Sequence, residues 1–164
     1  TGVQTCALPI SLILLLVANG TPVLAGKYLG NYAAWPLDAN YMMADGKPFL
    51  GKSKTLRGLL LAVFATALTA EIFGLGWQLG ASFGALSMLG DLFSSFSKRR
   101  LGMPSGSQAP GLDQVPEALL PLAVCASPLG MQWFQVLITA GLFWLLEVML
   151  SRVLYSLHIR KHPW

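Results

Sequence analysis

Five apolar segments alternate with polar connections along this chain. They lie at about 10–26, 58–76, 78–97, 117–131 and 133–157. A helix needs about 20 mainly apolar residues to cross a bilayer, and most of these segments come close to that length or exceed it. The fourth segment is the shortest and contains two prolines. The pattern predicts an all-α integral membrane protein with about five transmembrane helices.

The basic residues predict how these helices are oriented. All eleven lysines and arginines fall in Lys27–Arg57, Lys98–Arg100 and Arg152–Lys161, whereas the connections that contain Trp77 and Trp133 carry none. Cytoplasmic loops are enriched in Lys and Arg, and tryptophans gather at membrane edges. We therefore expect a multi-pass protein of the cell (inner) membrane with its N-terminus outside and its C-terminus in the cytoplasm. Any active site in the longer polar loops then faces the cytoplasm.

The composition agrees with a membrane protein. Hydrophobic residues make up 54% of the 164 residues and charged residues only 11%, against about 25% charged residues in an average soluble domain. Membrane topology accounts for the net charge of +4, so we expect no nucleic-acid partner. The two cysteines have no metal-ligand spacing.

The first ten residues, "TGVQTCALPI", resemble the translated end of a sequencing-library adapter. We expect residues 1–10 to be non-native and residues 11–164 to form a single polytopic domain. No basic segment precedes the first apolar run, so no cleavable signal peptide is expected.

Asp91 is the most informative charged residue. Asp91, Ser94, Ser95 and Lys98 are spaced so that they share one stripe of a helix. An ionisable group near the end of a membrane span is costly unless it is paired, hydrated or bound to a cation. One hypothesis is a Mg²⁺ ligand beside cations that hold phosphate. The structural alternative is simple neutralisation of Asp91 by Lys98 or Arg99.

The loop that follows supplies a second carboxylate, Asp113, among glycines and prolines. Mg²⁺ is held by oxygen ligands, usually one or two carboxylates together with substrate phosphates. Asp91 and Asp113 suit one ion if the loop folds back, and Gln114 could then contact a base or sugar. Alternatively, Asp113 is only the N-cap of the fourth helix, with Glu117 four residues further on.

The first polar loop, residues 27–57, combines carboxylates with lysines and arginine. "GKPFLGKS" (46–53) matches the spacing of a P-loop, but that motif requires a preceding strand inside a βαβ unit, which is not expected here. A glycine-punctuated basic loop can still bind phosphate through backbone N–H groups and lysine charge. The alternative is a purely topological basic anchor.

Within the apolar segments, three polar or small features stand out. Glu147 is expected to pair with a polar group on another helix rather than to act in catalysis. Asn19, near Pro22, either caps a break in the first helix or lines the site. Gly80 and Gly84 lie four residues apart, which favours close helix packing in lipid.

Several motifs together resemble the CDP-archaeol synthase family of integral-membrane, CTP-dependent cytidylyltransferases. They are "NGTPVLA" (19–25), "PLD" (36–38), "DGKPFLGKSKTLRG" (45–58), "GDLFSSFSKRRLG" (90–102) and "LDQVPEALL" (112–120). The resemblance covers nearly all of residues 12–161. At Lys52 and Leu56 the chain departs from archaeal members and looks like a bacterial branch of the family.

The resemblance implies that a lipid phosphate attacks the α-phosphorus of CTP, forming a CDP-lipid for phospholipid synthesis and releasing pyrophosphate. Asp91 and Asp113 would be the Mg²⁺ ligands. The catalytic cations that hold the triphosphate and the lipid phosphate would be Lys54, Arg57, Lys98, Arg99 and Arg100. Further substrate contacts would come from Asn19, Asp38, Asp45, Lys52, Thr55, Ser94 and Gln114. The expected partners are CTP, a membrane lipid phosphate and the bilayer. A homo-oligomer is compatible with the sequence.

Two other functions are alternatives to this one. A CDP-alcohol phosphotransferase is rejected because "DGKPFLG" lacks the Ala-Arg pair and the downstream aspartates of that family. A small transporter or assembly factor without catalysis is the second hypothesis. It predicts polar residues in the middle of the bilayer, whereas nearly all charge here lies in the loops.

Overall fold

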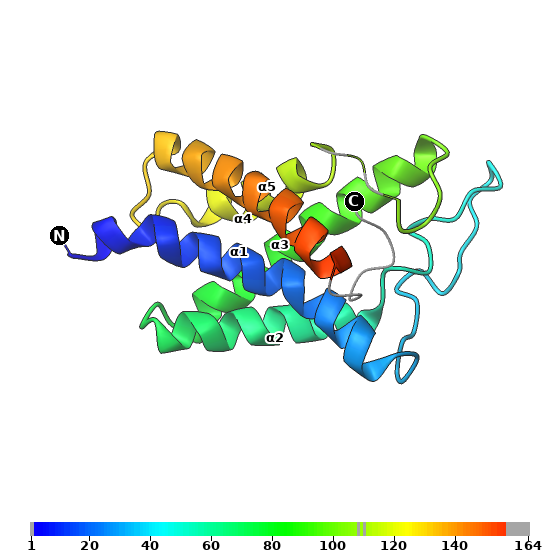
Figure 1. Cartoon of the computed structure of the whole chain (residues 1–164), viewed down its shortest axis with the longest axis horizontal. Helices are drawn as coiled ribbons and strands as arrows, with labels where there is room; N and C mark the ends of the chain where they lie inside the picture. The colour runs from blue at the N-terminus through cyan, green and yellow to red at the C-terminus, as the bar shows by residue number, and fades with distance from the viewer. Residues whose placement is uncertain (1, 108, 110, 157–164) are drawn as a thin grey trace.

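Helices provide the regular structure of residues 2–107, 109 and 111–156, which are the residues that the computed structural model describes (Figure 1). The five helices are α1 (Gly2–Leu29), α2 (Leu56–Ile72), α3 (Trp77–Arg100), α4 (Gln114–Cys125) and α5 (Trp133–Ser156). The all-α prediction is confirmed, with one helix for each apolar segment. The tail from residue 157 lies outside the described part of the chain, and it contains both histidines, Arg160 and Lys161.

Two of these helices are long and apolar enough to cross a membrane. They are the stretches Ala7–Leu29 of α1 and Trp133–Val153 of α5. Helix α4 is apolar but has only 12 residues, and α3 carries serines, Asp91 and a basic last turn.

Helix α1 continues through Pro22, so of the two alternatives for Asn19 the helix break does not occur. Proline removes one backbone N–H from a helix. Nearby side chains add hydrogen bonds to the backbone here: Asn19 Nδ2 donates to the Leu15 carbonyl at 3.0 Å, and Thr21 Oγ1 donates to the Val17 carbonyl at 2.6 Å.

Glycines bring α3 close to its neighbours. A Cβ atom on Gly80 would lie 2.5 Å from the Ala70 Cβ of α2, and a Cβ on Gly84 would lie 3.0 Å from the Thr66 Cβ. On the other side of α3, a Cβ on Gly90 would collide with the backbone of α4 at Pro116. The predicted close packing of Gly80 and Gly84 is therefore confirmed, and α3 lies between α2 and α4.

The long loops gather at one end of the bundle. Figure 1 shows the connection between α1 and α2 and the one that follows α3 at the same end, and the two short connections at the opposite end. The first loop forms only two isolated bridges, Pro36–Thr55 and Met42–Pro48. Since no strand precedes residues 46–53 in the described part of the loop, this stretch is not a P-loop fold, as expected.

Candidate active site

An ion pair between Lys54 and Asp91 lies where the first loop meets α3. Lys54 Nζ is 2.6 Å from Asp91 Oδ1 and 2.5 Å from Oδ2, and both side chains are about one-fifth exposed. Lys54 directly precedes the N-cap of α2, so the start of that helix fixes its position. Asp91 is therefore neutralised by a residue 37 positions away. The alternative in the sequence analysis, neutralisation by Lys98 or Arg99, is not what the structure shows.

Lys98 instead pairs with Asp113. Its Nζ is 2.6 Å from Asp113 Oδ1 and donates to the Ser107 carbonyl at 2.8 Å. The other Asp113 oxygen accepts a hydrogen bond from the Ala109 N–H at 2.9 Å. Although Asp113 occupies the N-cap position of α4, its side chain does not cap that helix. The two predicted metal ligands thus have different lysine partners.

Arg99 is buried with much of its hydrogen-bonding capacity unused. Its side chain is 3% exposed, and its Nε and Nη1 atoms have no hydrogen-bond partner among the described residues. Burial lowers the pKa of the guanidinium, and the charge of Asp113 partly opposes this effect. A Cβ on Gly51 would lie 3.7 Å from Arg99 Nη1, so the guanidinium faces the first loop. Buried donors of this kind require an acceptor, and an anion is the strongest one.

Arg100 fastens the first loop to the end of α3. Its Nη1 is 2.5 Å from Asp45 Oδ2, and its Nη2 donates to the Pro48 carbonyl at 2.6 Å. Lys47 Nζ donates to the Arg100 carbonyl at 3.0 Å. The backbone N–H of Lys47 and, to a smaller extent, Arg100 lower the pKa of the Asp45 carboxyl. In this arrangement both Asp45 and Arg100 shape the loop.

Asp38 organises the same loop from within. Its Oδ2 accepts the N–H groups of Leu50 and Gly51 at 2.8 and 2.9 Å, and its Oδ1 accepts the Asn40 N–H at 3.1 Å. Partial burial tends to raise the pKa of this carboxyl, but the backbone N–H donors outweigh burial and bring the pKa below its ordinary value. Gly51 has a φ of +94°, which a glycine adopts without strain.

The remaining predicted loop residues have distinct surroundings. Thr55 caps α2, because its Oγ1 accepts the Gly58 N–H at 3.2 Å. Arg57 donates to the carbonyl groups of Tyr32 and Gly30 and so ties the start of α2 to the loop after α1. Lys52 is exposed to solvent.

Three further predicted residues lie on α1, α3 and α4. Ser94 is fully buried and donates to the Asp91 carbonyl at 2.9 Å, within its own helix. Gln114 is buried, and its Oε1 accepts the Gly111 N–H at 2.8 Å. Asn19 Nδ2 donates to Ser87 Oγ of α3 at 3.2 Å. Of the three, only Asn19 lines the pocket that contains Asp91.

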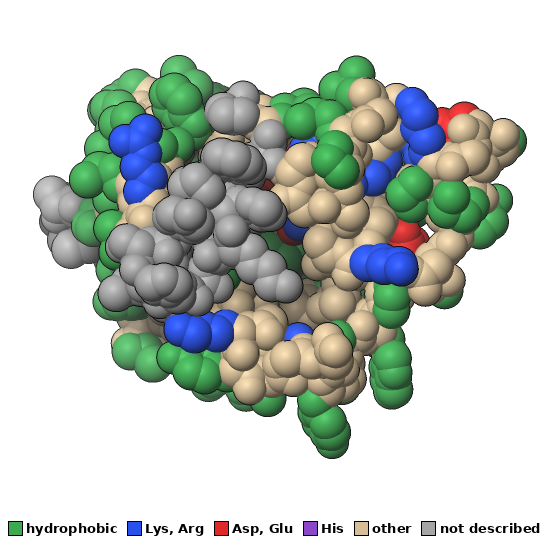
Figure 2. Space-filling model, turned by 45° about the vertical axis from the view of Figure 1, so that its right-hand side comes forward, with side chains coloured by type: hydrophobic (Ala, Val, Ile, Leu, Met, Phe, Trp, Pro, Cys, Tyr) green, Lys and Arg blue, Asp and Glu red, His purple; other side chains and the backbone are tan. Residues whose placement is uncertain are grey.

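That pocket is polar and has a volume of about 230 Å³. Its lining residues are Asn19, Pro22, Val23, Ser53, Lys54, Met88, Asp91, Glu117 and Glu147. A second cavity of about 130 Å³ also borders Lys54 and Asp91 and adds Thr55 and Arg57. Figure 2 shows lysine and arginine side chains around a hollow in the molecular surface. The Lys54–Asp91 pair therefore faces a site large enough for substrate groups.

Glu117 is the residue of this site that the sequence analysis missed. It is 4% exposed, it lines the polar pocket together with Glu147 of α5, with which it interacts, and its Oε1 has no hydrogen-bond partner in the described residues. This contact confirms that Glu147 pairs with a polar group on another helix. An acidic residue inside the apolar run of α4 was the signal that could have identified Glu117.

The site suits a hard cation held partly by substrate. In the part of the chain that the structure describes, no three Asp, Glu, His or Cys side chains form a ready-made metal site. Mg²⁺ typically uses one or two carboxylates together with waters and substrate phosphates. Asp91 and Glu117, both in the polar pocket, have the appropriate oxygen donors.

The model of the CarS-like CDP-archaeol synthase family matches residues 8–164. The chain belongs to the CDP-archaeol synthase family. The CDP-archaeol synthase of Sulfurisphaera tokodaii is 35% identical over 156 residues, which cover 91% of this chain and 90% of that protein. The corresponding protein of Sulfolobus acidocaldarius is 33% identical over 155 residues and covers 91% of both chains. The resemblance seen in the motifs is confirmed.

A solved structure is also similar to this member of the CDP-archaeol synthase family. It is described as an intramembrane enzyme for archaeal membrane lipids biosynthesis, with a TM-score of 0.70 and 31% identity, covering 87% of this chain and 90% of that one. Together with the apolar helices α1 and α5, this similarity identifies the chain as a membrane protein. Its family identifies it as an enzyme, a CTP-dependent cytidylyltransferase that acts on a lipid phosphate. Membership of a bacterial branch stays a prediction.

Proposed function

We propose that this enzyme transfers CMP from CTP to a glycerol-phosphate lipid with ether or ester chains, releasing pyrophosphate and supplying a CDP-activated lipid for phospholipid synthesis. The observation that carries this proposal is that Lys54 and Asp91 line one pocket. About two turns after Asp91, α3 also carries the buried and partly unpartnered guanidinium of Arg99. A cation, a carboxylate and free N–H donors are what a transfer between phosphates needs, since it depends mainly on positioning and charge neutralisation.

In the proposed reaction, an oxygen of the lipid phosphate forms a bond to the α-phosphorus of CTP. The bond from that phosphorus to the bridging oxygen of the β-phosphate breaks, and pyrophosphate leaves with the bond electrons. Lys54 and Arg99 neutralise the charge on the phosphate groups during this step. Lys98, Arg57 and Arg100 lie nearby and contribute positive charge, while Arg100 also holds the loop in place through Asp45.

Asp38 and Thr55 position other groups of the site in this proposal and do not contact the substrate. Asp38 orients the N–H groups around Gly51, and Thr55 fixes the start of α2 directly after Lys54. Lys52 and Gln114 are the residues left to contact the nucleotide from the loops. Lys52 is free to move because it is exposed, whereas Gln114 needs only to exchange its bond to Gly111.

We propose Mg²⁺ as the cofactor, held by Asp91 with Glu117 in the same pocket. When bound, Mg²⁺ supplies positive charge to the phosphate oxygens. Lys54 then exchanges Asp91 for a phosphate group. Asp113 does not line this pocket and is neutralised by Lys98, so it would be a further ligand only after Lys98 turned to a phosphate.

The proposed topology has five membrane crossings, with the N-terminus outside and the active site on the cytoplasmic side of the cell membrane. Two basic segments meet at one end of the bundle, through the contacts between Arg100 and the first loop. Trp77 and Trp133 begin the helices at the other end and are 58% and 71% exposed. Helix α4 alone spans only about 18 Å, so its crossing includes the adjoining turns, which must be covered by protein.

The test uses purified enzyme in detergent with Mg²⁺, radiolabelled CTP and either phosphatidic acid or an ether-linked lipid phosphate. We expect a labelled, lipid-soluble product from the wild type and at least about a 100-fold lower rate from Asp91→Asn. Glu71→Gln is the matched control, since Glu71 is an exposed carboxylate at the opposite end of α2. A folded wild-type protein that forms no product with either lipid would overturn the proposal and favour the transporter or assembly-factor hypothesis.

A further inference from the structure

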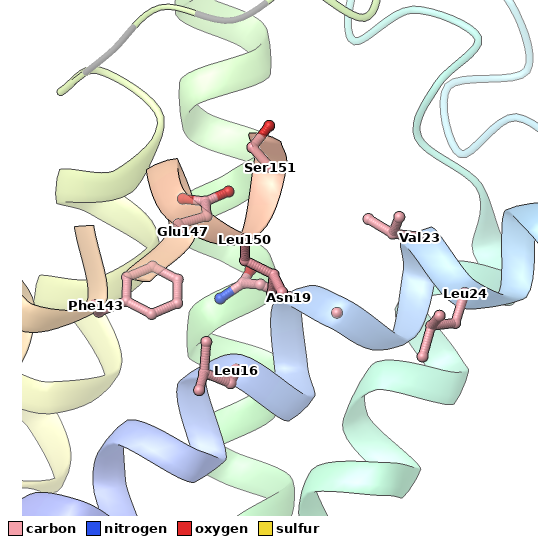
Figure 3. Close-up of a pocket in the computed structure, with 9 residues that line it drawn as sticks. Leu16, Asn19, Val23, Leu24, Phe143, Glu147, Leu150 and Ser151 are labelled. Atoms are coloured by element: carbon pink, nitrogen blue, oxygen red, sulfur yellow. The ribbon is translucent and has the colours of Figure 1, made fainter. Parts of the chain in front are cut away.

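An apolar groove lies between α1 and α5 (Figure 3). Its volume is about 270 Å³, and it is lined by Leu16, Asn19, Gly20, Val23, Leu24, Phe143, Glu147, Leu150 and Ser151. These are the two helices that are long and apolar enough to cross a membrane. Most of the lining is aliphatic or aromatic, which is typical of a site for an apolar ligand.

The groove has a buried floor and an exposed rim. Phe143 is fully buried, whereas Leu24 and Leu150 at the sides are 45% and 42% exposed. On helices that cross a bilayer, these leucines contact the hydrocarbon region. Gly20 leaves the space open, because a Cβ atom added there would meet nothing within 4 Å. A hydrocarbon chain can therefore enter from the membrane without passing through water.

One end of the groove joins the polar pocket of the active site. Asn19, Val23 and Glu147 line both spaces, and the polar pocket also contains Lys54 and Asp91. Figure 3 shows Asn19 of α1 and Glu147 of α5 on the two sides of the groove, among apolar side chains. The surroundings change here from apolar to charged, as they do within a lipid phosphate.

We propose that the groove between α1 and α5 binds the hydrocarbon chain of the lipid phosphate next to its glycerol, and that Glu147 is a specificity-determining residue at the polar end. The chain lies against Phe143 and Gly20, and the polar side chains of Glu147 and Asn19 lie where the chain joins the glycerol. The phosphate then reaches Lys54. The identity of the lipid rests on the proposed function.

A nucleotide does not suit this groove. Its phosphates and base would lose hydration without gaining partners, because Asn19, Glu147 and Ser151 are the polar side chains of the lining. CTP therefore approaches from the loop end of the molecule, where the lysines and arginines lie, and the lipid from the side.

The first test blocks the groove with Gly20→Phe. Because Gly20 has open space around it, the new ring fills the groove without disturbing the helices, and phenylalanine is a better helix former than glycine. We expect the KM for the lipid phosphate to rise about tenfold or more, with the affinity for CTP unchanged. Gly141→Phe is the matched control: Gly141 lies on α5, is exposed, also has open space and does not line the groove.

The second test does not depend on turnover. Phosphatidic acid with a diazirine in its chain is photolysed with the enzyme, and the labelled peptides are identified by mass spectrometry. We expect label in 16–24 and 143–151, lost in Gly20→Phe and retained in Gly141→Phe. If the label is spread over other lipid-facing helices, or if Gly20→Phe does not change the labelling, the proposal that the groove binds the hydrocarbon chain is wrong.

Variants at Glu147 test its role. Glu147→Gln keeps a hydrogen-bonding side chain, so we expect a smaller rise in the KM for the lipid than with Glu147→Leu, and a changed preference between ether- and ester-linked substrates. Equal effects of both variants on kcat alone would contradict a role in lipid recognition.

The two proposals fail in different ways. If the wild type makes no CDP-lipid but the photolabel still enters the groove, the proposed function fails and the lipid site stands. If the wild type is active and Gly20→Phe changes neither the KM for the lipid nor the labelling, the proposed function is retained and only the proposal of a lipid site in the groove is wrong.

Discussion

Lys54 Nζ lies 2.6 Å from Asp91 Oδ1, so the carboxylate that we propose as a Mg²⁺ ligand is neutralised by the lysine that we propose as a phosphate ligand. The pair joins the start of α2 to the first charged residue of α3. In the proposed reaction, substrate and Mg²⁺ would give each partner a new counter-ion, so the total charge of the site would stay balanced.

Replacing Lys54 by glutamine removes this balance. We expect the affinity for CTP with Mg²⁺ to fall about 10- to 100-fold, because a hydrogen bond to a charged group contributes about 1.5–3 kcal/mol. Equilibrium binding of labelled CTP measures the effect. Lys27→Gln makes the same change in net charge at an exposed position near the end of α1 and is expected to have a much smaller effect. Equal losses in the two variants would show that only the overall charge matters.

Arg99 offers a test of geometry rather than charge. Its guanidinium is a planar, multidentate donor whose buried Nε and Nη1 groups have no acceptor among the described residues, and lysine does not provide this donor geometry. We expect Arg99→Lys to weaken CTP binding by about 10-fold or more, as measured by the shift in thermal unfolding temperature that CTP produces. Arg152→Lys, on the exposed face of α5, is the control. Full retention of the CTP-induced shift in Arg99→Lys would exclude Arg99 as a phosphate ligand.

The first loop should loosen in acid. The pKa of Asp38 in the folded protein lies below its ordinary value of 3.8, so the carboxylate stabilises the loop above that pH, and the stabilisation is lost as the pH falls through the folded pKa. Hydrogen exchange at the Leu50 and Gly51 amides measures this. We expect their protection to drop as the pH falls below about 4 in the wild type. In Asp38→Asn it should already be reduced at neutral pH, and pH-independent protection in the wild type would contradict the role of Asp38.

Gly90 is expected to be essential for packing. A methyl group there would overlap the α4 backbone at Pro116, so Gly90→Ala should destabilise the fold by about 1–3 kcal/mol and separate Asp91 from Glu117. Thermal unfolding in detergent measures the loss. Gly141→Ala, in open space on α5, should be neutral or stabilising by up to about 1 kcal/mol. Similar melting temperatures for the two variants would mean that α3 and α4 are not in tight contact.

Much of the fold follows from local patterns. The five apolar segments predict five helices, although the fourth is short. The basic clusters correctly associate the loops after α1 and α3, which meet through Arg100 and Asp45. The course of α1 was harder to predict, because Pro22 allowed a break in the helix, whereas α1 runs through this proline to Leu29.

The site was predictable in its members but not in its pairings. Helix spacing put Lys98 next to Asp91, whereas the loops bring Lys54 to Asp91 and Asp113 to Lys98. Contacts between residues 37 positions apart depend on how loops fold back, which periodicity does not encode. Glu117 was missed because its neighbour Glu147 comes from a helix that adjoins it only in three dimensions.

Helix α3 carries Asp91 and Arg100 on one continuous element, and each side chain is joined to a different part of the first loop. Deleting one residue between them would turn one partner by about 100° relative to the other and shorten their separation by about 1.5 Å. Both attachments of the loop could not then form together. The length of this stretch of α3 is therefore fixed by the two attachments, while insertions remain tolerable at the exposed tip of the first loop.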